Sequence, residues 1–122
     1  MPGRRDHIVV FVTCSTATEA DRIAHALVEQ RLAACVNVHE ARVRSTYRWQ
    51  GRIETAGEHL LVIKTARRLF ARLEAAIKRL HSYQVPEIIA VPVVLGSRSY
   101  LDWLDDCLQP EARSRPKKAS RA

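Results

Sequence analysis

The sequence predicts a single α+β domain in which strands and helices follow the order β-α-β-β-α-β, with a short helix at the end. Three observations carry this prediction. Continuous, β-branched runs at 8–12, 59–64 and 88–94 are typical of strands. Stretches with apolar residues at helical spacing lie between them. The length of 122 residues fits one domain with a core of its own.

The first strand and helix are the best marked. The run IVVFV at 8–12 has no alternation, which is typical of a strand buried on both faces. Thr16 followed by Glu19 has the spacing of a capping box, which predicts a helix start. The apolar stripe of this helix consists of Ala20, Ile23, Ala24, Leu27 and Val28. The helix is expected to end near 31–32.

A long hairpin is predicted next. A strand begins at 33–39, and from Arg42 the residues alternate with period two, Val43, Tyr47 and Trp49 pointing one way. The pair Gln50-Gly51 occupies the position of a two-residue turn. The chain then returns from Arg52, passes an irregular stretch at 56–57 and enters the strand 59–64.

The second half repeats the pattern of the first. A helix stripe is formed by Leu69, Phe70, Leu73, Ala76, Ile77 and Leu80. The connection HSYQVP leads to a strand at 88–94, where Pro92 predicts an edge or a bulge. Ser99, with Asp102 three residues later, predicts the cap of the last helix. Two βαβ units in this order define the ferredoxin-like split arrangement.

The predicted hairpin does not suit an isolated chain. Arms of roughly eight residues reach about 25 Å at about 3.3 Å per residue, beyond what a small domain covers. They carry the large aromatic residues Tyr47 and Trp49, and such edges are normally paired or covered. Two helices on one face of the sheet also leave the other face bare. An oligomer is therefore expected.

The charge and the cysteine content of the chain bear on its binding partners and on its cellular compartment. The net charge is +7, but residues 110–122 alone hold five basic residues and one acidic residue. We expect a domain at 1–109 and a basic, disordered tail at 110–122. Nucleic acid is not the expected partner of this tail. No apolar run is long enough to cross a bilayer, and no signal peptide is recognisable. Three cysteines at unrelated spacings indicate free thiols, so a cytoplasmic protein is expected.

Five separated motifs resemble one known family. RLAACVNV, STYRWQGRIE, EHLLVIKT, HSYQVPEIIAVPV and YLDWL follow the order and spacing of the CutA divalent-cation tolerance family over about residues 7–108. The resemblance implies a ferredoxin-like subunit and a compact homotrimer whose long hairpins pair between subunits. It also implies a role in divalent-metal tolerance, copper binding, or a function similar to that of trimeric PII-type signalling proteins.

Two departures from the family pattern concern the site. Similar sequences have proline between the histidine and the tyrosine of the fourth motif, whereas this chain has Ser82, so we expect a less rigid segment. Some members carry a cysteine at the end of the first strand and paired histidines before the tyrosine. This chain has Cys14 slightly later and a single histidine, His81, after Leu80. Such a copper site is not carried over whole.

The chemistry-bearing residues favour binding over catalysis. Hydrolase, P-loop and dinucleotide-binding motifs are absent from the sequence, so no enzyme is expected. Thiolate and imidazole suit copper or zinc, and the proposed metal ligands are His81, Cys35, Glu87 and Cys14. Alternative roles are a helix C-cap or surface imidazole for His81 and a buried core thiol for Cys35. Cys14 lies near a helix N-terminus, which predicts a lowered pKa.

The remaining histidines and aromatic residues have other interpretations. His39 and His59 lie near strand ends, as ligands or as strand surface, and His7 and His25 are expected to face solvent. A ligand cleft between subunits is predicted from Trp49, Lys64, Tyr83 and Glu58, and interface or core packing is the other interpretation of Trp49 and Trp103. The leading hypothesis is a cytoplasmic homotrimer that binds a divalent metal, copper above all. The rival is a PII-like signalling or scaffolding trimer that binds a metabolite or a protein and has no metal role.

Overall fold

The computed structural model describes residues 6–109, and the predicted tail at 110–122 lies outside them. In chain order, the elements are β1 (His7–Cys14), α1 (Ala17–Glu29), β2 (Cys35–Val38), β3 (Val43–Trp49), β4 (Arg52–Ala66), a 3₁₀ turn η2 (Arg67–Leu69), α2 (Phe70–Leu80), β5 (Ile88–Pro92) and α3 (Arg98–Cys107). The predicted α+β order is confirmed. The second predicted strand is divided into β2 and β3.

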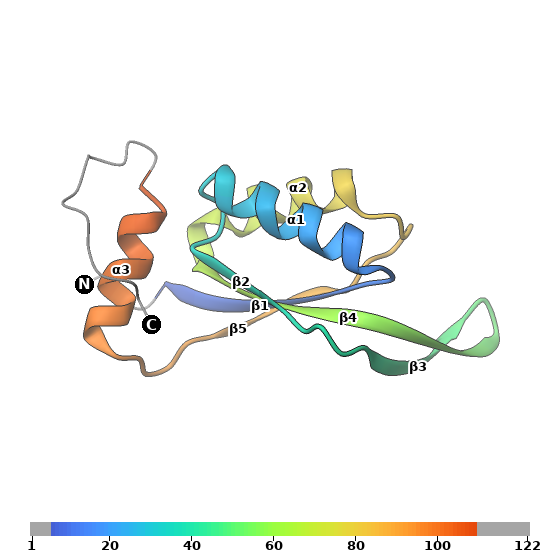
Figure 1. Ribbon diagram of the computed structural model, residues 1–122. Helices are drawn as coiled ribbons and strands as arrows, with labels where there is room; N and C mark the ends of the chain where they lie inside the picture. The colour runs from blue at the N-terminus through green and yellow to red at the C-terminus, as the bar shows by residue number, and fades with distance from the viewer. Residues whose placement is uncertain (1–5, 110–122) are drawn as a thin grey trace.

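The strands form one antiparallel sheet. Its order is β2-β4-β1-β5, and β3 pairs with residues 52–58 at the start of β4. The two βαβ units are interleaved, as a ferredoxin-like fold requires. Figure 1 shows α1 and α2 over one face of the sheet, while the β3–β4 hairpin extends beyond them at one end. None of the helices within residues 6–109 is long and apolar enough to cross a membrane.

The core lies between the sheet and these two helices. Ile8, Val10, Val12 and Cys14 alternate along β1 and face the helices, and all four are buried. Val9 and Phe11 face the other way and are only half-buried. The prediction that β1 is buried on both faces is therefore wrong, because no described element covers the second face. The core also contains Ile23, Leu27, Leu61, Ile63, Leu73 and Ile77.

The hairpin is a continuous ladder from its base to its turn. Gln50 and Gly51 have φ values of 52° and 80°, the left-handed conformation that a tight two-residue turn requires. β4 runs unbroken for 15 residues, so the irregular stretch expected at 56–57 is wrong. Gly57 pairs with Arg44 in register, and the Arg42 guanidinium packs against it. A Cβ at Gly57 would lie 3.0 Å from Arg42 Cζ, so the glycine admits a close contact without interrupting the strand.

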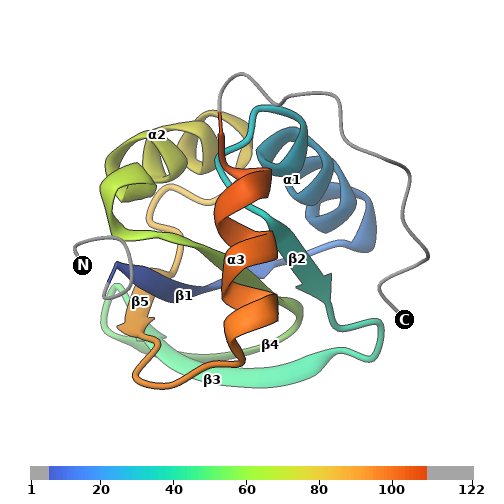
Figure 2. The same cartoon turned by 90° about the vertical axis from the view of Figure 1, so that its left-hand side faces the viewer.

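The last helix closes the end of the sheet opposite the hairpin, as Figure 2 shows from that side. Its N-cap is Ser97, whose hydroxyl accepts from the Tyr100 backbone N–H, and not Ser99 as predicted. His7 is buried at 2 % exposure, and its Nε2 lies 2.8 Å from Asp105 Oδ1. The expectation that His7 faces solvent is wrong because α3 packs over the start of β1. His25 is exposed, as predicted.

Exposed apolar residues are concentrated on β5 and its flanks. β5 pairs with β1 alone, so Pro92 lies on an edge strand as predicted. Large apolar side chains left open to solvent in this region and on the hairpin include Ile53, Val85, Ile89, Val91, Val94 and Leu95. The single chain therefore leaves apolar surface of the kind that marks an interface.

Candidate functional site

Three ligating side chains converge in the interior where β1, α1 and α2 meet. Cys14 is the last residue of β1, Glu19 lies in the first turn of α1, and His81 follows the last residue of α2. One ligand atom from each lies within 4.8 Å of the others, and all three residues are buried. We call these residues the Cys14–Glu19–His81 cluster.

The His81 ring is held in one tautomer by its hydrogen bonds. Its Nε2 lies 2.8 Å from the Thr13 carbonyl oxygen, which can only accept, so Nε2 carries the proton. Its Nδ1 accepts from the Tyr83 backbone N–H at 3.0 Å. The lone pair of Nδ1 also faces Glu19, whose Oε2 lies 3.3 Å away. A ligating histidine is normally oriented in this way, with the other ring N–H bound to a carbonyl.

Glu19 has a second role beyond the helix cap. Thr16 Oγ1 accepts from the Glu19 backbone N–H at 3.1 Å, which confirms the predicted cap. The Glu19 carboxylate accepts the backbone N–H of Ser82 at 2.7 Å and its hydroxyl at 2.9 Å. A proline at position 82 would have neither a backbone N–H nor a hydroxyl to donate. The two hydrogen bonds from Ser82 therefore hold the segment that we expected to be less rigid without proline.

Cys14 is a protonated thiol in the metal-free protein. Burial in the core, followed by the negative charges of Glu19 and Glu58, raises the pKa of Cys14 to about 12. The lowered pKa predicted for it is wrong, because the thiol faces the core at the end of β1 while α1 begins only at Ala17. A metal that binds Cys14 must displace this proton.

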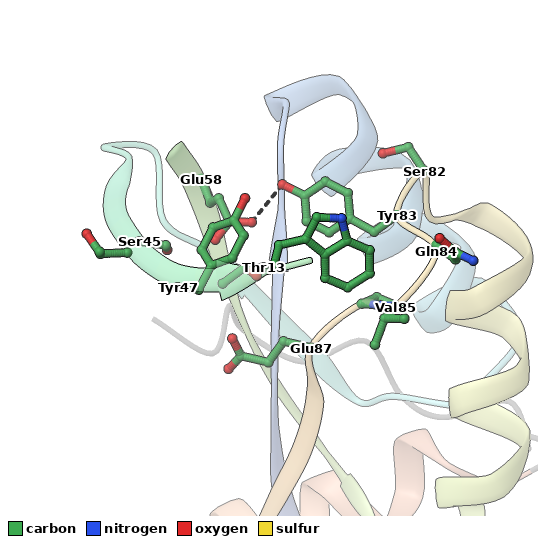
Figure 3. Close-up of a pocket in the computed structure, with 12 residues that line it drawn as sticks. Thr13, Ser45, Tyr47, Glu58, Ser82, Tyr83, Gln84, Val85 and Glu87 are labelled. Carbon is green, nitrogen blue, oxygen red and sulfur yellow. Dashed lines mark hydrogen bonds between the residues drawn. The ribbon is translucent and has the colours of Figure 1, made fainter. Parts of the chain in front are cut away.

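A cleft of about 830 Å³ opens beside the cluster, between β3, β4 and the loop 82–87 (Figure 3). Tyr83 connects the two: its backbone N–H binds His81, and its hydroxyl donates to Glu58 Oε2 at 2.7 Å. Burial and that hydrogen bond raise the pKa of Tyr83 well above its usual range. Burial and the neighbouring Glu58 also raise the pKa of Glu87. Two carboxyl groups, those of Glu58 and Glu87, thus line the cleft.

The structure separates the predicted ligands into different places. Cys14 and His81 lie in the cluster, but Cys35 does not: it pairs with Lys64, whereas Cys14 pairs with His59, five residues earlier on β4. The Lys64 ammonium donates to the Asn37 side chain between β2 and β4. Lys64 is absent from the described lining of the cleft.

The other predicted residues lie at the cleft. Trp49, Tyr83, Glu58 and Glu87 all line it, so Glu87 belongs with the cleft and not with the cluster. His59 is buried, contrary to its interpretation as strand surface, and its Nδ1 lies 2.9 Å from the His39 carbonyl oxygen.

Sequence reasoning missed two members of these sites. Glu19 was interpreted only as a capping residue, because nothing in the sequence shows that its carboxylate turns toward the loop after α2. Tyr47 was placed on the hairpin face beside Trp49 without a role in the cleft, which both line. The period-two alternation that places Tyr47 and Trp49 on one face was the available signal.

The fold and the two sites define a class of protein: a ferredoxin-like domain with a projecting hairpin and a buried thiol–imidazole–carboxylate cluster at the base of that hairpin. The family model described as CutA1 divalent ion tolerance protein matches residues 8–107. The chain belongs to this family.

Relatives support the assignment over most of the chain. The divalent-cation tolerance protein CutA of Thermus thermophilus is 49% identical over 96 residues, which cover 79% of this chain and 92% of the relative. The solved structure of the periplasmic divalent cation tolerance protein CutA from Archaeoglobus fulgidus has a TM-score of 0.81 and 38% identity, covering 84% of this chain and 99% of that one. The solved Thermus thermophilus protein has a TM-score of 0.78 at 48% identity, covering 80% and 94% of the two chains.

Proposed function

We propose that this chain binds a divalent metal ion, copper being the expected one, at the Cys14–Glu19–His81 cluster, and that it contributes in this way to metal tolerance. The convergence of three donor atoms within 4.8 Å in the interior is the observation that supports this most. Sulfur and imidazole ligands favour copper and zinc over magnesium and calcium. The proposed role is binding and not catalysis.

The three residues fit a metal of this type. The Nδ1 lone pair of His81 is available in the tautomer that its bond to Thr13 fixes. A metal held by these residues would take the place of the Tyr83 N–H at Nδ1 and of the proton on Cys14, and the Glu19 carboxylate would offset part of its charge. Binding would therefore release a proton and would break a hydrogen bond of the loop that begins at Ser82, which also lines the cleft.

Titration of chelator-stripped protein with Cu(II) tests the site. We expect one tight site per chain in the wild type and its loss in Cys14→Ala. The matched control is Cys35→Ser, which removes a half-buried thiol outside the cluster and should leave the tight site intact. Equal affinity in all three proteins would overturn the assignment, since exposed histidines alone would then explain the binding.

We further propose that the chain assembles as a homotrimer that covers its exposed edge. β5 is an edge strand, and Ile89 and Val91 are exposed on it. Sedimentation of two variants tests this. Val91 and Val28 are both 44% exposed, but Val28 lies on α1. Val91→Lys should dissociate the assembly, and Val28→Lys should not. A wild type that sediments as a single chain would contradict the proposal.

The cleft favours a second candidate function, that of a signalling or scaffolding trimer without a metal role. Its concave shape, aromatic lining and few polar groups are those of an ordinary small-molecule site. A thermal-shift screen with metals and metabolites separates the two candidates, because only true ligands raise the unfolding midpoint. We propose the cytoplasm as the compartment of this chain, a location that the free thiols of Cys14 and Cys35 favour.

A further inference from the structure

The cleft beside the cluster is acidic, although the part of the chain that the structure describes is nearly balanced in charge. The sequence holds 20 Lys and Arg residues against 13 Asp and Glu residues. Yet the charged side chains among the described residues that line the cleft are Glu58 and Glu87, with no basic residue among them. Seven of the 20 basic residues but only one of the 13 acidic residues lie outside residues 6–109, so a random patch on the described part of the chain is expected to be nearly neutral. The cleft is therefore a local site of negative potential.

Neither carboxylate has a cationic partner in the described part of the chain. Glu58 is 5% exposed, and the group bound to it is the neutral Tyr83 hydroxyl, at Oε2. Between 6 and 109, no salt bridge involves Glu58 or Glu87. Buried charges are normally paired. A cation that enters the cleft would supply the missing partner.

The walls of the cleft suit an organic cation. Trp49 and Tyr47 are 40% and 42% exposed and line the cleft together with Tyr83, while Val85 and Pro86 add apolar surface. Aromatic faces attract an ammonium group, most strongly when it is partly desolvated. Figure 3 shows the carboxylates of Glu58 and Glu87 and the ring of Tyr47 around the same opening. Neither carboxylate belongs to a group of metal-ligating side chains in the described chain.

We propose that this cleft binds a small organic ammonium cation, with its charge between Glu58 and Glu87 and its hydrocarbon part against Tyr47 and Trp49. The inference rests on the second candidate function, the small-molecule cleft, and names its ligand class. It is independent of metal at the cluster.

Choline and its neutral carbon isostere, dimethylbutanol, form the matched pair of probes, with benzoate as an anion. Binding is measured by calorimetry on the full chain in the presence of a chelator, so failure of the metal proposal does not affect the result. We expect choline to bind at least tenfold more tightly than the isostere, about the effect of a partly desolvated cation–π contact. Benzoate should not bind.

Two variants locate the site. Glu87→Gln keeps the shape of an exposed side chain but removes its negative charge, and it should weaken choline binding about tenfold. Trp49→Leu should weaken it as well. Glu40→Gln, which removes an exposed carboxylate outside the cleft, should change nothing.

Three results would overturn the proposal. If the isostere or benzoate binds as well as choline, the cleft remains a small-molecule site but the ligand class is wrong. If no probe binds the assembled wild type, both the proposed ligand class and the proposal of a cleft open to small molecules are refuted. This would be the result if a basic side chain of a second copy filled the cleft. Unchanged choline affinity in Glu87→Gln and Trp49→Leu would place the ligand elsewhere.

Discussion

Replacing Glu19 with alanine should destabilise the chain by about 3 kcal/mol. The Glu19 carboxylate accepts two hydrogen bonds from Ser82, at 2.7 and 2.9 Å, and is 5% exposed. Hydrogen bonds to a charged group contribute about 1.5 to 3 kcal/mol each. We take the lower value for each bond, because Ser82 is exposed and can bind water in the variant.

Urea unfolding in the presence of a chelator measures this effect, with all variants at one protein concentration. Thr16→Ala removes only the cap hydroxyl and should cost about 1 kcal/mol. Asp21→Ala, on the exposed face of the same helix, should cost almost nothing. A double-mutant cycle between Glu19→Ala and Ser82→Ala should give a coupling of about 1 kcal/mol. A loss below that of Thr16→Ala, with no coupling to Ser82, would refute this account of the loop.

Three further predictions concern single groups. Burial raises the pKa of Cys14 from 9.0 to about 12, so the contribution of the protonated thiol to the free energy of unfolding is complete below pH 9 and is lost as the pH rises to about 12. In urea unfolding at alkaline pH, wild type should therefore lose about 1.4 kcal/mol per pH unit relative to Cys14→Ala between these two values. Tyr83→Phe leaves the buried Glu58 without its donor and should cost about 1 to 2 kcal/mol in the same assay, and a neutral result would contradict the bond. Gln50→Asn creates Asn-Gly at a turn with φ values of 52° and 80°, and thermal unfolding should show a gain of about 0.5 kcal/mol; a loss would mean that Gln50 has a contact elsewhere.

Local patterns predicted the fold because each one is decided over a few residues. The Thr16 cap, the Gln50-Gly51 turn and the edge position of Pro92 depend on neighbours in the chain, and all three hold. The failures depend on distant contacts. His7 was expected in solvent, but it is buried by a helix almost a hundred residues away in the chain.

The site was predicted in part for the same reason. Cys14 and His81 were singled out by residue type, and the structure brings them together. The sequence does not show that Cys35, also a thiol, lies further along the sheet beside Lys64. It also does not show that Glu19 points into the interior, because a capping-box spacing fixes a helix start and not the direction of a carboxylate.

X-ray absorption of the protein loaded with one equivalent of copper tests the central claim most directly. The proposed cluster predicts one sulfur scatterer and at least one imidazole in the first shell, from Cys14 and His81. The sulfur should disappear in Cys14→Ala and persist in Cys35→Ser. A first shell of nitrogen and oxygen alone in the wild type would contradict the proposed metal centre.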